Sequence, residues 1–132
     1  MDDTIRLCAV EDIRNLKSRY FQCMDFKRWE EYPGLFTDDF IVYEEDGSVR
    51  STGGAAFAAA VSGFLADAKT LHQAYLPEIE VIDADNARAL WAMHDILTWE
   101  VGAPGSGMKR IEGWGTTTKP TGARSAAGRS PA

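Results

Sequence analysis

An aspartate and a histidine are the residues of this chain best suited to acid–base chemistry. Asp25 ends a long amphipathic segment, and His72, one of two histidines, lies near the start of a strand-like segment. A carboxylate that orients an imidazole makes a general base near neutral pH, and proton transfer of this kind requires no metal or cofactor. We therefore predict that the fold brings Asp25 and His72 together inside an apolar pocket.

Two tyrosines complete the predicted catalytic set, and all four residues also have a plain structural interpretation. Tyr20 lies on the apolar face of the first helical segment, where it can pack in the core or polarise a substrate. Tyr43 ends a short strand and has the same alternatives. Asp25 can face solvent, although a carboxylate is unfavourable at a helix C-terminus. His72 can be a hydrogen-bonded strand histidine.

The elements that must position these side chains follow from the spacing of apolar residues. A helix is predicted over residues 4–25 by Ile13, Leu16, Tyr20 and Met24, with Arg14, Lys17, Ser18 and Arg19 largely between them. Further helices are predicted over 29–36 and 53–67, and strands over 40–43, 70–82, 87–101 and 108–115. This order favours an α+β fold, in which a curved antiparallel sheet packs on about three helices and encloses a ligand cavity.

Side-chain alternation sorts the polar residues of the strand over 87–101. Asp95 shares a face with Trp91 and Met93 and can enter the pocket, whereas His94 is on the opposite face. We therefore expect His94 on the surface or in a subunit interface. The large side chains Trp91, Met93, Trp99 and Trp114 are expected to build the core or an interface.

Composition and charge exclude several classes of function. The chain has 132 residues, enough for one domain, and a net charge of −6 with a pI of about 4.8, which argues against nucleic acid or an anionic membrane as partner. No apolar run approaches the roughly 20 residues of a membrane span. The acidic N-terminus has no secretory signal pattern, and Cys8 and Cys23 are too far apart on one helix to form a disulfide, so a cytoplasmic location is predicted.

The composition changes sharply after residue 115. Residues 116–132 contain no Val, Ile, Leu, Phe, Tyr or Trp, so they offer too little apolar surface to offset the entropy of ordering. We therefore place the domain at 1–115 and an atypical flexible tail, natural or an expression remnant, at 116–132.

The genetic code offers a second interpretation of this tail. A synonymous back-translation of residues 115–132, started at its third base, encodes His-Tyr-His-Glu-Thr-Tyr-Arg-Arg-Glu-Val-Gly-Gly-Trp-Gln-Ile-Ala-Ser. That sequence has the pattern of a strand, a Gly-Gly turn and a second strand. We predict that a one-base deletion near codon 115 replaced the native C-terminal strands; a gene sequence that cannot encode this second frame would exclude the idea.

Several segments resemble the SnoaL-like proteins of the nuclear-transport-factor-two-like superfamily. They are residues 13–25, Trp29 with Leu35-Phe-Thr-Asp-Asp39, Leu71-His72 with residues 77–81, and residues 87–93, so that the resemblance covers about residues 5–115. It implies a cone fold, in which a curved antiparallel sheet wraps over helices and encloses an apolar pocket. Members of the family form dimers or trimers, so a homo-oligomer is expected.

Within this family the chain is most similar to the subgroup of scytalone dehydratase, hexachlorocyclohexane dehydrochlorinase and bile acid 7α-dehydratase. The resemblance implies that Asp25 and His72 are the catalytic pair and that Tyr20 and Tyr43 are pocket tyrosines. It implies a cofactor-independent lyase or isomerase that acts on a hydrophobic small molecule. The alternatives are a non-catalytic ligand-binding module, or an inactive member damaged by the frame change. No zinc-type, phosphate-loop or G-x-S-x-G spacing supports another chemistry.

Overall fold

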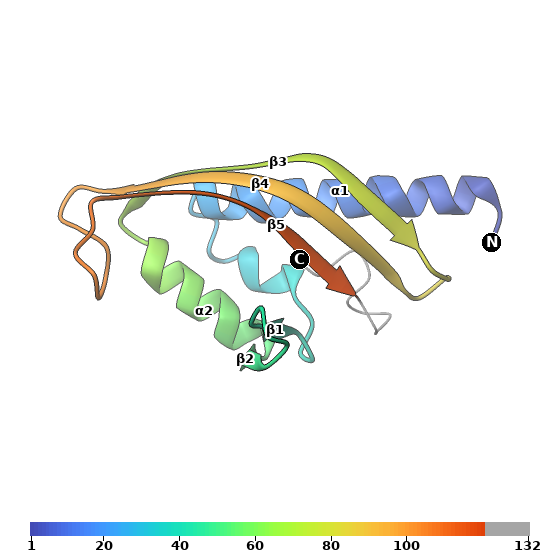
Figure 1. Ribbon diagram of the computed structural model, residues 1–132, viewed down its shortest axis with the longest axis horizontal. Helices are drawn as coiled ribbons and strands as arrows, with labels where there is room; N and C mark the ends of the chain where they lie inside the picture. Colours follow the sequence, from blue (N-terminus) through green and yellow to red (C-terminus); the bar gives the residue numbers. More distant parts are fainter. Residues whose placement is uncertain (121–132) are drawn as a thin grey trace.

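The computed structural model describes the backbone of residues 1–120 and the side chains of residues 1–116. Two α-helices, a short 3-10 helix and five strands follow one another (Figure 1): α1 Asp3–Asp25, η1 Tyr32–Leu35, β1 Ile41–Tyr43, β2 Val49–Thr52, α2 Gly54–Leu65, β3 Ala68–Val81, β4 Ala87–Trp99 and β5 Arg110–Pro120. The predicted α+β class and antiparallel sheet are confirmed. No helix within residues 1–120 combines the length and apolarity needed to cross a membrane.

Helix α1 begins and ends close to the predicted residues. Asp2 caps it, since its Oδ1 accepts a hydrogen bond from the amide of Ile5 at 2.9 Å. The amide of Phe26 donates to the carbonyl of Gln22 at 2.8 Å and closes the last turn, which leaves Asp25 at the end of the helix. The C-terminal half of α1 packs against β3, whereas Ile5 and other residues near the N-terminus are exposed.

The 3-10 helix η1 is shorter than the helix predicted over residues 29–36. Pro33 occupies its first turn, where a fixed φ and a missing N–H are tolerated. The helix cannot continue because Phe36 is extended, with φ −115° and ψ 152°. A single 3-10 turn thus takes the place of the predicted helix. It places Tyr32, Leu35 and Phe36 in the core.

The strands form two antiparallel sheets that do not close into a barrel. The hairpin of β1 and β2 is separate from a sheet of order β3-β4-β5, whose strands arch over α2 and the hairpin in Figure 1. Within the larger sheet His72 of β3 is opposite Asp95 of β4, which is opposite Gly113 of β5. This register sets the three residues in one row across the sheet.

Strand β5 runs past the predicted domain boundary at residue 115. Its pairing with β4 continues until Pro120, which is opposite Arg88. The boundary was placed by the lack of large apolar side chains after residue 115, but a backbone ladder does not depend on side-chain apolarity, and Thr is a residue type that strands favour. The remainder of the predicted tail, residues 121–132, lies outside the described residues.

An aromatic cluster beneath the sheet joins the three helices. Tyr32 is fully buried and its ring is 5.6 Å from the ring of Tyr20 and 5.1 Å from that of Phe36. Phe36 in turn contacts Phe40 and Phe57, with ring centroids 5.0 and 5.3 Å away. The cluster holds the end of α1 at a fixed position relative to α2.

Two glycines of α2 allow a matched test of this packing. A Cβ on Gly54 would lie 2.6 Å from the carbonyl oxygen of Thr37, whereas one on Gly63 would meet nothing within 4 Å. We expect Gly54→Ala to lower the free energy of unfolding by about 1–3 kcal/mol, because backbone must move to admit the methyl group. Gly63→Ala is expected to raise it by about 0.5–1 kcal/mol through helix propensity. Urea denaturation of both variants measures the difference, and equal effects would contradict the close approach.

Candidate active site

The structure brings Asp25 and His72 into direct contact. Oδ1 of Asp25 is 2.7 Å from Nδ1 of His72, and Oδ2 accepts a hydrogen bond from the His72 amide at 3.1 Å. Both side chains are largely buried, with 16% of Asp25 and 6% of His72 exposed. The carboxylate therefore fixes the imidazole with its proton on Nδ1 and leaves Nε2 as the basic nitrogen.

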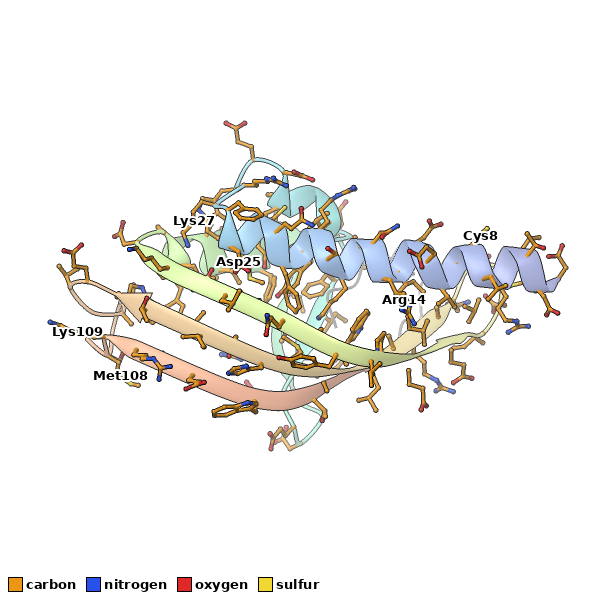
Figure 2. All side chains as sticks on the ribbon, turned by 90° about the horizontal axis from the view of Figure 1, so that it is seen from above. Cys8, Arg14, Asp25, Lys27, Met108 and Lys109 are labelled. Atoms are coloured by element: carbon orange, nitrogen blue, oxygen red, sulfur yellow. The ribbon has the colours of Figure 1, made fainter. Side chains whose placement is uncertain are left out.

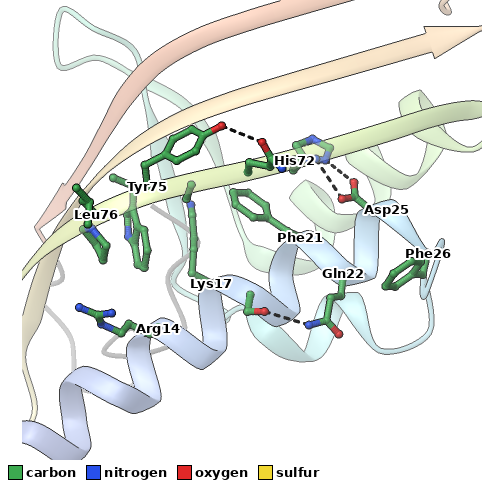
Figure 3. Close-up of a pocket in the computed structure, with 14 residues that line it drawn as sticks. Arg14, Lys17, Phe21, Gln22, Asp25, Phe26, His72, Tyr75 and Leu76 are labelled. Atoms are coloured by element: carbon green, nitrogen blue, oxygen red, sulfur yellow. Dashed lines mark hydrogen bonds and ion pairs between the residues drawn. The ribbon is translucent and has the colours of Figure 1, made fainter.

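Neighbouring residues hold this pair in place. Thr70, two residues before His72 on the same face of β3, donates a hydrogen bond of 2.7 Å from its hydroxyl to Oδ1 of Asp25. The ring of Phe21, one turn before Asp25 on α1, stacks on the imidazole with centroids 5.5 Å apart. The end of α1, where Figure 2 labels Asp25, and the first part of β3 thus orient the two reacting groups jointly, and Figure 3 shows their contact.

The environment keeps Asp25 ionised. Partial burial raises the pKa of Asp25, but the hydrogen bonds from His72 and Thr70 lower it more, so the pKa of this carboxyl lies below its ordinary value. The hydrogen bonds of the folded state thus favour the ionised carboxylate of Asp25 over the protonated acid. They stabilise the fold wherever this carboxylate is ionised.

This shift predicts a pH dependence of stability. A carboxyl with a lowered pKa in the folded state stabilises fully above its unfolded pKa of about 3.9, and the effect is lost as pH falls through the folded pKa. We expect wild type to melt at a higher temperature than Asp25→Asn above about pH 5, and the gap to close in stronger acid. Thermal unfolding between pH 2 and pH 7 measures it; a gap that is constant with pH would contradict it. Asp12→Asn, on the exposed side of α1, is the control for loss of a carboxylate.

His72 lines two cavities. The first, which we call the interior cavity, has a volume of about 710 Å³, lies between α2, the hairpin and the sheet, and is partly open to solvent, with mainly apolar walls. A cleft of about 540 Å³ lies between α1 and β3 and is also lined by Asp25 (Figure 3). A ligand in either cavity can reach the imidazole.

Asp95 faces the interior cavity, as side-chain alternation predicts. It is opposite His72 in the sheet and lines the same cavity. A Cβ on Gly113 would lie 2.9 Å from its Oδ1, so glycine at this position leaves room for the carboxylate. His94 points to the other face, where its Nε2 is 2.8 Å from Glu112 and its ring stacks on the exposed Trp114 at 4.8 Å.

The two predicted tyrosines occupy different environments. Tyr20 packs between Phe21, Tyr32 and Phe36. Burial raises the pKa of Tyr20, against an opposing effect of the Tyr32 hydroxyl, and the charge of Asp95 raises it further, so Tyr20 stays protonated. The phenol of Tyr20 is thus close enough to Asp95 for the charge of the carboxylate to affect its pKa. Tyr20 is nevertheless not among the residues that line the two cavities.

Tyr43 is not brought to the catalytic pair. Its side chain is 54% exposed, and its neighbour Val42 lines the interior cavity in its place. The physical reason is the alternation of strand β1, which directs successive side chains to opposite faces.

Lys17 also differs from the prediction, which set it between the apolar positions of the first helix. Instead of lying on a polar face of α1, it is only 4% exposed, and its ammonium lies 5.1 Å from the ring centroids of Tyr20 and Phe21 and 5.6 Å from that of Trp91. The available signal was the spacing, since Tyr20 and Phe21 follow Lys17 by three and four residues, the helical distance for a cation and an aromatic ring to meet.

Within residues 1–120 no group of three His, Cys, Asp or Glu side chains is placed to hold a metal ion.

The fold and this pocket define a small α+β protein of the nuclear-transport-factor-two-like superfamily. The model of the SnoaL-like domain matches residues 6–119, and the chain belongs to that family. A search of curated proteins gave no match.

Solved structures share this fold at low sequence identity. The Kfla4162 protein of Kribbella flavida has a TM-score of 0.71 and 19% identity, over 86% of this chain and 79% of its own. A candidate scytalone dehydratase of Novosphingobium aromaticivorans has a TM-score of 0.68 and 17% identity, over 92% and 95% of the two chains. An epoxide hydrolase of Mycobacterium tuberculosis has a TM-score of 0.60 and 12% identity, over 84% and 74%. At these identities the likeness concerns the fold alone.

Proposed function

We propose that this protein is a cofactor-independent lyase or isomerase in which the Asp25–His72 pair abstracts a proton from a hydrophobic small molecule. The observation that carries the proposal is the 2.7 Å contact between Asp25 and His72 at the wall of an apolar cavity. The hydrogen bond of such a pair is stronger where water is excluded, because the local dielectric constant is low. The similar fold of a candidate scytalone dehydratase supports the same chemistry by analogy.

The elimination proceeds through Nε2 of His72. This nitrogen takes the proton from a carbon next to an activating group, and the electrons of the broken C–H bond form a C=C bond. In a dehydration, the C–O bond of the adjacent carbon breaks, and the leaving hydroxide takes the proton back from the imidazolium of His72 and departs as water. The imidazolium that forms is stabilised by Asp25, whose carboxylate already contacts Nδ1.

Asp95, which lines the interior cavity, fits a supporting role, and the buried phenol of Tyr20 lies behind that wall near Asp95. Tyr20 is a protonated phenol and thus a hydrogen-bond donor, and Asp95 is a carboxylate opposite His72. Asp95 can therefore accept a hydrogen bond from a water molecule or hydroxyl group in the cavity, whereas Tyr20 lines neither cavity and fits only an indirect role beside Asp95. Tyr43, by contrast, has no part in the proposed mechanism because of its exposure.

Dehydration of a phenyl-substituted β-hydroxy ketone tests the proposal. The product is a conjugated enone, which absorbs in the ultraviolet, so the reaction needs no coupled enzyme. Deuterium uptake at the α-carbon in heavy water, followed by NMR, separates proton abstraction from loss of the leaving group. An isomerase shows the exchange without net elimination.

The competing function is a binding module that holds a ligand without reaction. The interior cavity is large enough for a molecule of drug-like size, and its mainly apolar walls favour binding by themselves. If aromatic ketones bind but neither exchange nor elimination exceeds the rate with denatured protein, the binding module is the correct function.

A further inference from the structure

The interior cavity contains an acceptor group that proton abstraction does not require. Its walls are mainly apolar, yet the carboxylate of Asp95 lines it together with His72. Within residues 1–116, whose side chains the structure describes, no hydrogen bond or ion pair engages this carboxylate, and its effect on Tyr20 acts through space. A half-buried carboxylate without a partner is unfavourable unless the contents of the cavity supply a donor.

Strand pairing sets this carboxylate beside the proposed base. Asp95 of β4 is directly opposite His72 of β3. Residues directly opposite each other in antiparallel strands have Cβ atoms about 4.5–5.5 Å apart on the same face of the sheet. Nδ1 of His72 is already engaged by Asp25 at 2.7 Å, which leaves Nε2 for a ligand. A ligand with a carbon atom at the imidazole therefore has Asp95 as a neighbouring polar group of the cavity wall.

An ionised carboxylate discriminates between polar groups of similar size. It accepts hydrogen bonds and donates none, so it binds an O–H group but not the oxygen atom of a ketone or an ether. A hydrogen bond to a charged acceptor is roughly twice as strong as one between neutral groups. A ligand that lacks a donor also leaves the acceptor unpaired, and this lowers its affinity. The carboxylate of Asp95 thus favours an alcohol over a ketone of the same shape.

The other charged residue of this cavity has its charge directed elsewhere. Arg50 and Ser51 line the cavity from strand β2 of the hairpin. The Arg50 side chain is 70% exposed and pairs with Glu44 at 3.6 Å, so its guanidinium is largely in solvent. Among the described residues, Asp95 is the one carboxylate that lines the interior cavity. Recognition of a donor group near the imidazole is therefore assigned to Asp95.

A glycine on the neighbouring strand leaves the space that this carboxylate occupies. Gly113 of β5 is opposite Asp95, and a Cβ on it would lie 2.9 Å from Oδ1 of that residue. The Asp95 side chain would have to rotate away from such a methyl group, at little cost to the fold because only its far end is involved. Gly115, two residues later on the same face of β5, would place its Cβ more than 4 Å from any other group.

We propose that Asp95 determines the specificity of the site by binding a hydroxyl group of the substrate, with Gly113 as the positioning residue that leaves room for the carboxylate. The inferred substrate class is a largely apolar alcohol whose hydroxyl group lies close to the carbon that faces His72. A ketone or an ether without this hydroxyl group is discriminated against. Identification of the ligand as a substrate rests on the proposed function, whereas recognition of a hydroxyl group follows from Asp95 and the cavity alone.

Equilibrium binding of an isosteric pair of probes tests the inference without any turnover. The alcohol α-tetralol and the ketone α-tetralone share one bicyclic skeleton and differ only in the oxygen function. Calorimetry measures the dissociation constant of the ketone and of each enantiomer of the alcohol. We expect wild type to bind the better enantiomer of the alcohol about tenfold more tightly than the ketone, because only the alcohol donates a hydrogen bond to the carboxylate.

Replacement of the carboxylate by an amide assigns this preference to Asp95. The amide of Asp95→Asn carries N–H bonds that a ketone can accept, and its oxygen is a neutral acceptor. The alcohol-over-ketone ratio should therefore fall about fivefold or more. Asp12→Asn, on the exposed side of α1, is the control for loss of one carboxylate and should leave the ratio unchanged.

A pair of glycine substitutions tests the position of the carboxylate without removing it. Gly113→Ala should lower the alcohol-over-ketone ratio about threefold or more, because the methyl group displaces Oδ1 of Asp95. Gly115→Ala should leave the ratio unchanged, and the general effect of alanine in this strand is the same for both variants. Thermal unfolding verifies that each variant is folded, and Gly113→Ala decides the matter if Asp95→Asn is not.

Three results would overturn the inference: equal binding of alcohol and ketone by wild type, no binding of either probe at millimolar concentration, or an unchanged ratio in both Asp95→Asn and Gly113→Ala. Failure of the proposed function has a different signature. A protein that selects the alcohol but catalyses neither exchange nor elimination keeps the hydroxyl site and loses the enzyme assignment. A protein that catalyses exchange and binds alcohol and ketone equally does the reverse.

Discussion

Removal of either member of the catalytic pair is expected to lower the rate of deuterium exchange and of elimination about 10²–10⁴-fold, the usual contribution of a positioned general base. His72→Ala removes the base itself. Asp25→Asn keeps the shape of the side chain but no longer stabilises the imidazolium, and it can also hold the wrong tautomer. Because the two residues act as one unit, the double variant should be no slower than the slower single variant.

A second histidine–carboxylate pair in the same sheet provides the control. His94 and Glu112 are 2.8 Å apart, a contact much like that of the catalytic pair, but they lie on the outer face beside Trp114. His94→Ala should therefore leave the exchange rate within about twofold of wild type, whatever its effect on stability. If His94→Ala and His72→Ala reduce the rate equally, the loss reflects general damage to the fold and the catalytic assignment is wrong.

Restoring the second reading frame is expected to have the largest effect on stability. Replacing residues 116–132 by the sequence His-Tyr-His-Glu-Thr-Tyr-Arg-Arg-Glu-Val-Gly-Gly-Trp-Gln-Ile-Ala-Ser supplies the tyrosine, valine, tryptophan and isoleucine side chains that this segment lacks. Burial of a single large apolar side chain contributes about 1.5–3 kcal/mol. We therefore expect the melting temperature to rise by about 10 °C, measured by differential scanning calorimetry.

The matched control keeps the composition of the restored segment and removes its pattern. A scrambled version of the same residues, with the strand alternation and the Gly-Gly turn destroyed, should give no increase in melting temperature. An equal melting temperature for the present and the restored chain would show that the native sheet does not depend on the second frame. The rate of exchange measured on both chains shows whether the restored strands also complete the active site.

Local patterns in the sequence determined much of the architecture. Apolar spacing placed α1 within one residue of its start, which Asp2 caps in the structure. Alternation along β4 correctly separated Asp95 from His94. Both results depend on periodicities of the backbone, 3.6 residues for a helix and two for a strand, which the composition of a single segment displays without knowledge of its neighbours.

The tertiary structure decided what those patterns could not. The meeting of Asp25 and His72 depends on how α1 crosses β3, because 2.7 Å contacts between distant segments are set by packing and register. The course of β5 through residues 116–120 depends on hydrogen bonding to β4, which the lack of large apolar side chains in this segment did not indicate. Tyr43 and Lys17 show the same limit in opposite directions, since Tyr43 is exposed, whereas Lys17 is buried with its ammonium against Trp91 of the distant strand β4.

The sequence by itself thus identified the residue types for proton transfer, and only the tertiary structure decided which of them meet. The acid–base properties of a carboxylate and an imidazole belong to the side chains themselves. Asp25 and His72 could therefore be chosen as catalytic candidates before any fold was known. Their distance and the two cavities that His72 lines come from the assembly of elements far apart in the chain. Such assembly depends on the whole core rather than on any local segment.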